Sequence, residues 1–275
     1  MAALLALVAA LLWGLGAFLG GQASRRAALI PVLAVELLVG TIVIIPLAFL
    51  TAHRFAWVDL LIGGAAGFFG LLGVTFLYRG LRGPMAAVAP VAGVVSAALP
   101  LLWGVGFGER LSAWQIYGVI LGLMSIVLIS DTGRALHRIS LGPLVNGVLA
   151  GAGFGAGYIV LDATDPLTAP WPILGARLLP ALAVCAVAFA AHQPPSAVGP
   201  ARLWSVGAGI STVLASVAFL AAINRGLLST SSVLSCLHPA VTVLLARLFL
   251  RERMSPSQAT GLTVAVAAIS MITAG

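Results

Sequence analysis

Glu109-Arg110-Leu111-Ser112 and Glu252-Arg253-Met254-Ser255 are two copies of one short charged turn, and each copy lies between two apolar runs. After the serine, both copies continue with a glutamine and a glycine at identical spacing, Gln115 and Gly118 in the first and Gln258 and Gly261 in the second. A charged turn that recurs at fixed spacing between apolar segments indicates a duplicated unit.

The composition defines the class of protein. Of the 275 residues, 61% are hydrophobic and only 8% are charged, whereas a soluble domain is typically about 25% charged. A soluble fold could not cover its surface with so few charges, so we expect the apolar runs to face lipid. The net charge of +7 comes from arginines that lie mostly in the gaps between these runs. There they act as topology signals, so we expect no nucleic-acid partner.

Ten apolar segments have a length that suits a membrane helix, which needs about 20 residues. Those of the first half are 3–20, 30–50, 59–78, 85–106 and 114–129, and those of the second half are 141–160, 171–191, 203–223, 232–249 and 258–274. The run at the N-terminus has no basic stretch before it, so we take it as a membrane helix and not as a signal peptide. The expected fold class is an all-α membrane protein with ten transmembrane helices.

The two halves match beyond the charged turns. The first segment carries Gly14, Gly16 and Gly20, and the segment 141–160 carries glycines at the same spacing. These matches predict two five-helix repeats, residues 1–135 and 136–275. Because five spans is an odd number, the second repeat must enter the membrane from the opposite face, which makes the repeats inverted. The loop arginines favour a topology with both termini outside.

The chain resembles an EamA-type member of the drug/metabolite transporter superfamily. The resemblance rests on the following features: Trp13-Gly14, Tyr78-Arg79-Gly80-Leu81, Arg177-Leu178-Leu179, Pro239 and the two Glu-Arg-x-Ser turns. It covers nearly the whole chain. It implies a ten-helix transporter in the cell inner membrane that moves small metabolites, often amino acids and related compounds, by alternating access. We expect no cofactor.

Three features depart from the family pattern, and two alternative functions stay open. The first repeat has Glu36 where the family more often has an arginine, and the family more often places its termini in the cytoplasm. The first helix has no acidic residue, so the mechanism of the related four-helix multidrug exporters does not carry over. Efflux of cationic drugs, or a non-transporting membrane scaffold or lipid-carrier accessory protein, stay open as alternatives. An enzyme is not expected, because no nucleophile–base or metal pattern is present.

Glu36 and Arg177 are the two charges well inside the expected spans, and they occupy equivalent positions in the repeats. A charge in a membrane helix costs about 2.5–3.5 kcal/mol on insertion scales and therefore needs a partner or a use. One interpretation is a salt bridge between the two helices, or side chains that reach the membrane surface. The other is a clamp in which Glu36 binds the ammonium of a zwitterionic substrate and Arg177 binds its carboxylate.

The remaining candidates for substrate binding are His238 and five aromatic residues. His238 precedes Pro239 in the segment 232–249, where it is either a neutral structural residue or a group that binds substrate or a coupling proton. The aromatic candidates are Trp13, Tyr78, Trp103, Phe154 and Tyr158. Since Trp and Tyr also gather at membrane interfaces, an interfacial belt is the competing interpretation for Tyr78 and Trp103, which lie near the ends of their segments.

Glycine spacing and the serine of each charged turn predict local structure. In the segment 141–160, Gly147, Gly151 and Gly155 share one helix face and Gly153 and Gly157 mark another, which predicts close helix packing. Ser112 and Ser255 are placed to cap the helices that follow them. The glutamate–arginine pairs therefore belong either to capped turns or to gates at the two membrane faces.

Overall fold

The computed structural model describes residues 1–81, 85–130, 141–250 and 254–275, and over these ranges it is all-helical, with no strand. Three sequence predictions fall outside the described residues, and one of them is the boundary between the repeats at residues 135 and 136. Tyr78 contributes its backbone to a helix, but its side chain lies outside the described residues. The turn at Glu252 and Arg253 also lies outside them.

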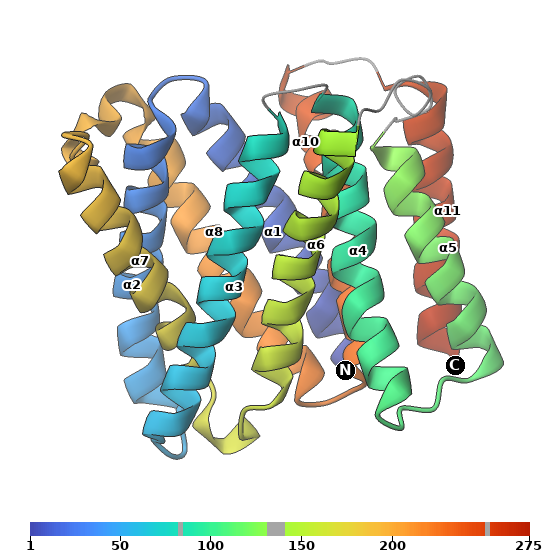
Figure 1. Ribbon diagram of the computed structural model, residues 1–275. Coiled ribbons are helices and arrows are strands. Elements are labelled where there is room, and N and C mark those ends of the chain that lie inside the picture. The colour runs from blue at the N-terminus through green and yellow to red at the C-terminus, as the bar shows by residue number, and fades with distance from the viewer. Residues whose placement is uncertain (82–84, 131–140, 251–253) are drawn as a thin grey trace.

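The first half of the chain forms five long helices: α1 (Ala2–Ser24), α2 (Leu29–Thr51), α3 (Trp57–Leu81), α4 (Met85–Gly106) and α5 (Ala113–Ile129). The second half forms α6 (Leu141–Asp162), α7 (Trp171–Ala190), α8 (Arg202–Ile223), α9 (Leu228–Ser235), α10 (His238–Leu250) and α11 (Pro256–Ala274), with short 3-10 helices η2 (Pro166–Thr168) and η3 (Pro195–Ala201). Successive long helices run in alternate directions, and both termini lie at the same end of the bundle (Figure 1). We call this end the terminal face.

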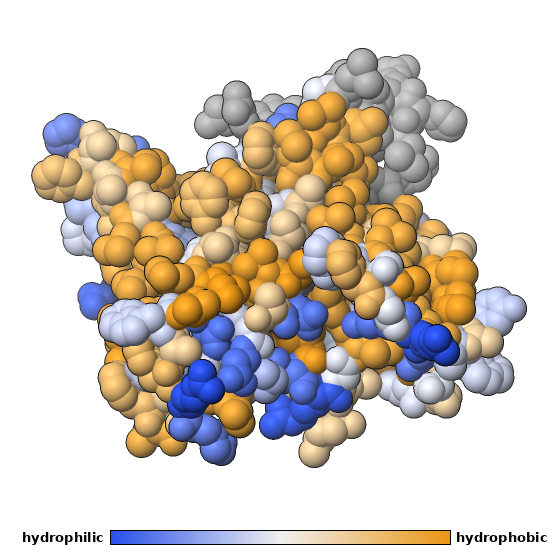
Figure 2. Space-filling view, turned by 60° about the horizontal axis from the view of Figure 1, so that its bottom comes forward, coloured by the Kyte–Doolittle hydropathy of each residue, from blue (hydrophilic) through white to orange (hydrophobic). Residues whose placement is uncertain are grey.

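The outer surface of the bundle is apolar. Among the described residues, eight helical segments are long and apolar enough to cross a membrane, and Val91–Gly106 and Ala113–Ile129 are two shorter apolar helices. Large hydrophobic side chains such as Leu4, Ile42 and Phe189 are exposed on the flanks. Figure 2 shows hydrophilic residues gathered toward the terminal face, below an apolar flank. Exposed apolar area on this scale needs lipid around it, so the protein is a multi-pass membrane protein.

The predicted helix caps are confirmed. Ser112 caps α5 by accepting from the backbone N–H of Gln115, and the Gln115 side chain accepts in return from the N–H of Ser112. Ser255 and Gln258 form the same capping box at the start of α11. Each box satisfies two backbone donors that a helix N-terminus otherwise leaves free. The repeated Ser-x-x-Gln of the sequence is therefore a helix start in both halves.

The two predicted glycine faces of α6 are also confirmed. A Cβ on Gly151 would lie 2.5 Å from the carbonyl oxygen of Ala92 in α4, and one on Gly147 would lie 3.1 Å from that of Val88. On the other face, a Cβ on Gly153 would lie 2.8 Å from the carbonyl oxygen of Phe69 in α3. The absence of side chains lets α6 lie against α4 on one side and α3 on the other, because dispersion contacts grow as the backbones approach.

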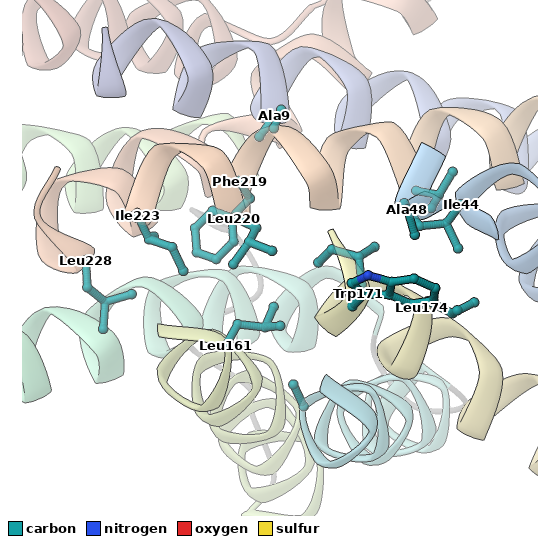
Figure 3. Close-up of a cluster of buried hydrophobic side chains, with 14 residues drawn as sticks. Ala9, Ile44, Ala48, Leu161, Trp171, Leu174, Phe219, Leu220, Ile223 and Leu228 are labelled. Atoms are coloured by element: carbon teal, nitrogen blue, oxygen red, sulfur yellow. The ribbon is translucent and has the colours of Figure 1, made fainter. Parts of the chain in front are cut away.

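A buried hydrophobic cluster joins α8 to its neighbours from both halves of the chain. Phe219, Leu220 and Ile223 extend from α8 toward Leu161 at the end of α6 (Figure 3). Phe219 is 0% exposed, which makes it the largest fully buried side chain among the described residues. α8 therefore runs through the interior of the bundle, and side chains on its surface are placed to meet helices of the other half.

The segment 232–249 lies within one candidate membrane span, Leu228–Leu250, but it is not one continuous helix. The chain instead begins α9 at Leu228, leaves the helix at Cys236 and Leu237, and begins α10 at His238. Pro239 has no N–H to donate, and its ring would collide with the carbonyl four residues earlier in a continuous helix. Proline is tolerated in the first turn of a helix, so the chain breaks just before it.

Candidate functional site

Glu36 and Arg177 are brought to the same region of the bundle by α8. Glu36 lies in the second turn of α2 and Arg177 in the second turn of α7, and both side chains are half-buried. α2 and α7 pack against each other, and both touch α8. Gly209 permits this approach, because a Cβ there would lie against the backbone carbonyl of Glu36.

Thr212 of α8 connects the two charges. Its hydroxyl donates to Glu36 Oε1 at 3.2 Å, and its backbone carbonyl accepts from Arg177 Nη2 at 2.6 Å. The same guanidinium nitrogen donates to Ser216 Oγ at 2.9 Å. Within the described residues, no salt bridge joins Glu36 to Arg177 directly. Each charge is therefore held by α8, and neither is neutralised by direct contact with the other.

An aromatic cluster gathers three of the predicted residues. The ring of Trp13 in α1 stacks on Tyr158 of α6 with centroids 5.6 Å apart, and it meets His238 of α10 edge-on at 6.5 Å. Phe219 of α8 completes the cluster at 5.4 Å from Trp13 and 4.6 Å from Tyr158. One helix of the first half of the chain, α1, and three of the second half, α6, α8 and α10, thus bring their rings together.

Thr212, Ser216 and Phe219 are functional candidates that the sequence reasoning missed. They recur at i, i+4 and i+7, which places them on one face of α8. This face carries the hydroxyl and carbonyl that hold the charges at one end and an aromatic ring at the other. The sequence gives no signal for this face, because Thr, Ser and Phe are common residues in membrane helices.

Two predicted residues do not join this region. Trp103 lies near the end of α4, is 45% exposed and stacks on Phe107 at 4.1 Å, a position typical of an interfacial belt. Phe154 packs on Gly73 of α3, where a Cβ would lie 2.8 Å from its ring. Its bulk fills a gap between α3 and α6. The side chain of Tyr78 lies outside the described residues.

His238 and Cys236 mark the polar edge of the aromatic cluster. The buried Nδ1 atom of His238 has no hydrogen-bond partner among the described residues. Cys236 Sγ lies 3.6 Å from Ser96 Oγ and also interacts with the Tyr158 side chain. Within the same ranges, no group of three or more His, Cys, Asp or Glu side chains lies close enough to hold a metal ion. A buried acceptor or donor without a partner is unfavourable unless a ligand or water uses it.

Apolar helices that enclose half-buried charges, hydroxyls and aromatic rings define a multi-pass membrane protein. The model of the EamA-like transporter family matches residues 1–131 and matches again over residues 142–274. The chain belongs to the EamA-like transporter family, and it is a membrane transporter of small molecules with the two-repeat architecture of that family.

Comparison with solved structures agrees with the fold. A protein of known crystal structure superimposes with a TM-score of 0.74 at 22% sequence identity, and the match covers 99% of this chain and 96% of that chain. At this identity the similarity concerns the fold alone. Among curated proteins, none matches the sequence.

Proposed function

We propose that this protein is a secondary transporter of amino acids or related zwitterions that works by alternating access, with efflux across the cell inner membrane as its direction. In this proposal all ten spans cross the bilayer, counting α9 and α10 as one, and residues 1–135 and 136–275 are inverted repeats. The alternate helix directions and the common end of the two termini support that arrangement (Figure 1).

The arrangement of Glu36, Thr212 and Arg177 carries this proposal. Two opposite charges, at positions that the sequence predicts to be equivalent in the repeats, both bond to Thr212 of α8 and form no direct salt bridge within the described residues. Charges in a purely structural role would be expected to pair directly, because a buried charge without a partner is strongly unfavourable. Charges kept apart suit a ligand that itself carries both signs. The guanidinium suits a carboxylate and the Glu36 carboxylate suits an ammonium.

The aromatic cluster supplies the apolar part of the proposed site. Phe219 lies three residues after Ser216 on α8, and its ring contacts those of Trp13 and Tyr158. Ser216 itself accepts a hydrogen bond from Arg177. Polar groups that fix orientation beside aromatic side chains that supply contact area are typical of small-molecule sites.

A difference between the two ends of the bundle supports alternating access. At the terminal face, Asp59 accepts from the Thr168 hydroxyl at 2.7 Å, and Arg54 forms a salt bridge with Asp165 at 3.6 Å. Toward the opposite end lie two hollows, one of about 460 Å³ between α2, η3 and α8 and one of about 280 Å³ between α1 and α10. The bundle is thus braced at one end and hollowed toward the other.

Counterflow in proteoliposomes tests the proposed substrate class. We expect accelerated uptake of labelled substrate when the liposomes are preloaded with neutral amino acids, and no acceleration with lipophilic cations. Acceleration by cations alone would support the alternative of multidrug efflux. If neither class exchanges while the reconstituted protein stays folded, the proposed substrate class is wrong.

His238 is the proposed group for a coupling proton, because imidazole titrates near neutral pH and Nδ1 has no partner among the described residues. We expect uptake driven by a pH gradient to lose its pH midpoint in His238→Ala. Exchange at equal pH on both sides should continue in this variant. Measuring uptake across a series of external pH values checks the expectation, and an unchanged midpoint would exclude His238 from coupling.

A further inference from the structure

The half-helix α9 is unusually polar for a segment inside a membrane protein. Five of its residues carry hydroxyl groups, and all eight residues from Leu228 to Ser235 are buried. Some of these hydroxyls bond to nearby carbonyls, such as Ser235 to the carbonyl of Ala6 at 3.2 Å. The buried Oγ of Ser232 has no hydrogen-bond partner among the described residues. Burying an unpaired hydroxyl is unfavourable, which suggests that Ser232 meets water or a ligand in another conformation.

α9 runs from the terminal face toward the aromatic cluster, so its hydroxyls lie along this path. Its N-terminus lies at the terminal face, and its C-terminal end passes through Cys236 and Leu237 to His238 at the aromatic cluster (Figure 1). α9 packs against α4 and α5 of the first half and against α1. It therefore spans the distance between the proposed central site and the terminal face.

Glu109 closes the outer end of α9 from the other half of the chain. Its carboxylate accepts from the backbone N–H of Leu228 at 2.7 Å and from that of Ser229 at 3.0 Å, and it also accepts from the Ser229 hydroxyl. These groups are free donors at the start of a helix, where a negative charge is also favoured by the helix dipole. The first copy of the charged turn thus caps its own helix through Ser112 and caps α9 through Glu109.

Gly104 makes room for this cap. The Glu109 side chain folds back over α4, and a Cβ on Gly104 would overlap its carboxylate. The turn is held by a bond from the N–H of Glu109 to the carbonyl of Gly104 at 2.9 Å, and Gly108 has a φ of 105°, which favours glycine. The backbone of the turn is therefore shaped to present the carboxylate to α9.

We propose that α9 is the polar wall of the route between the central site and the terminal face, and that Glu109 locks this route shut in the present conformation. Release of the carboxylate lets α9 move away from α4, and the hydroxyls of Ser229 and Ser232 then face water in the route. This inference rests on the proposed alternation between two conformations, but it does not depend on which substrate is carried.

The native thiol of Cys236 reports on the route, since it is 1% exposed and lies at the inner end of α9. In a Cys185→Ala background, we measure the rate at which a membrane-impermeant, positively charged methanethiosulfonate modifies Cys236 in oriented vesicles. We expect Glu109→Gln to raise this rate roughly tenfold, because the amide loses charge-assisted acceptor bonds to α9. Gly104→Ala, which displaces the carboxylate without removing it, should also raise the rate.

Two controls separate opening of the route from general loosening. Arg110→Gln changes a neighbouring exposed charge and should leave the Cys236 rate unchanged. Ser205 is fully buried in α8 near the opposite end and serves as a second reporter position. The thiol of Ser205→Cys should stay unreactive when Glu109→Gln is present and both native cysteines are replaced by alanine. The faster reaction should occur only when the reagent is added on the side of the termini.

The proposal would be overturned if Cys236 reacted at the wild-type rate in both Glu109→Gln and Gly104→Ala. It would also be overturned if Arg110→Gln accelerated the reaction equally. The same holds if reagent added on the opposite side were equally effective, or if the Ser205 reporter reacted equally faster. In those cases the α9 hydroxyls serve helix packing alone. These outcomes are independent of the counterflow result, because modification of the thiol requires no transported substrate.

Discussion

Arg177→Gln is expected to raise the apparent KM for a zwitterionic substrate by roughly 10- to 100-fold. The change removes charge-assisted hydrogen bonds to a carboxylate, which are worth about 1.5–3 kcal/mol. Glu36→Gln should weaken binding similarly, and it should also reduce the preference for the amino acid over an analogue that lacks the ammonium group. The apparent KM and the preference for the amino acid over the analogue both follow from initial rates of uptake into proteoliposomes across a range of substrate concentrations.

A matched control for this experiment is Arg247→Gln. Arg247 lies in the last turn of α10 with an exposed side chain, so it is an arginine at a helix end and outside the proposed site. Its loss should leave the KM near the wild-type value. An unchanged KM in both Glu36→Gln and Arg177→Gln would refute the clamp and leave these charges as ties between α2, α7 and α8.

Gly63→Ala is expected to lower the midpoint of thermal unfolding by roughly 5 °C or more. A Cβ on Gly63 of α3 would overlap the backbone carbonyl of Pro172 in α7, and Gly175 of α7 meets the carbonyl of Leu60 in the same way. A backbone carbonyl cannot move aside as a flexible side chain can, so the two helices must separate. Overpacking of this kind costs about 1–3 kcal/mol.

Gly70→Ala in the same helix is the control for this crossing. A Cβ on Gly70 would meet no atom within 4 Å, and alanine is about 1 kcal/mol better than glycine within a helix. The midpoint of Gly70→Ala should therefore stay level or rise. The midpoints of both variants are measured from the fraction of protein that stays monodisperse in detergent after heating to a series of temperatures. Equal midpoints for the two would show that α3 and α7 do not rely on this close approach.

The class of the protein and its local structure were predictable from the sequence. Long apolar runs with few charges leave lipid as the solvent, and a membrane-spanning helix must satisfy its backbone internally, so helix was the expected structure. Ser112 and Ser255 predicted the helix caps, and the glycines from Gly147 to Gly157 predicted two packing faces of one helix. These signals act over a few residues of one helix, and for that reason sequence spacing alone carries them.

Which charges and rings meet was decided only by the tertiary structure. The sequence singled out Glu36, Arg177, Trp13, Tyr158 and His238, but it could not place α8 between the first two or bring Phe219 to the others. It also could not separate Trp103 from the site, because a tryptophan near a helix end is as suited to the interface as to a cavity. Such meetings depend on helix order and rotation, which arise from contacts between residues far apart in the chain.

The repeated turn shows the same division. Its sequence by itself determined that the chain is duplicated and that Ser112 begins a helix, because Ser-x-x-Gln satisfies donors within a single turn. Only the tertiary structure decided that Glu109 caps α9, more than a hundred residues away in the chain. The physical reason is that a carboxylate bonds whichever free N–H groups the packed fold brings to it, and the turn's own sequence does not contain them.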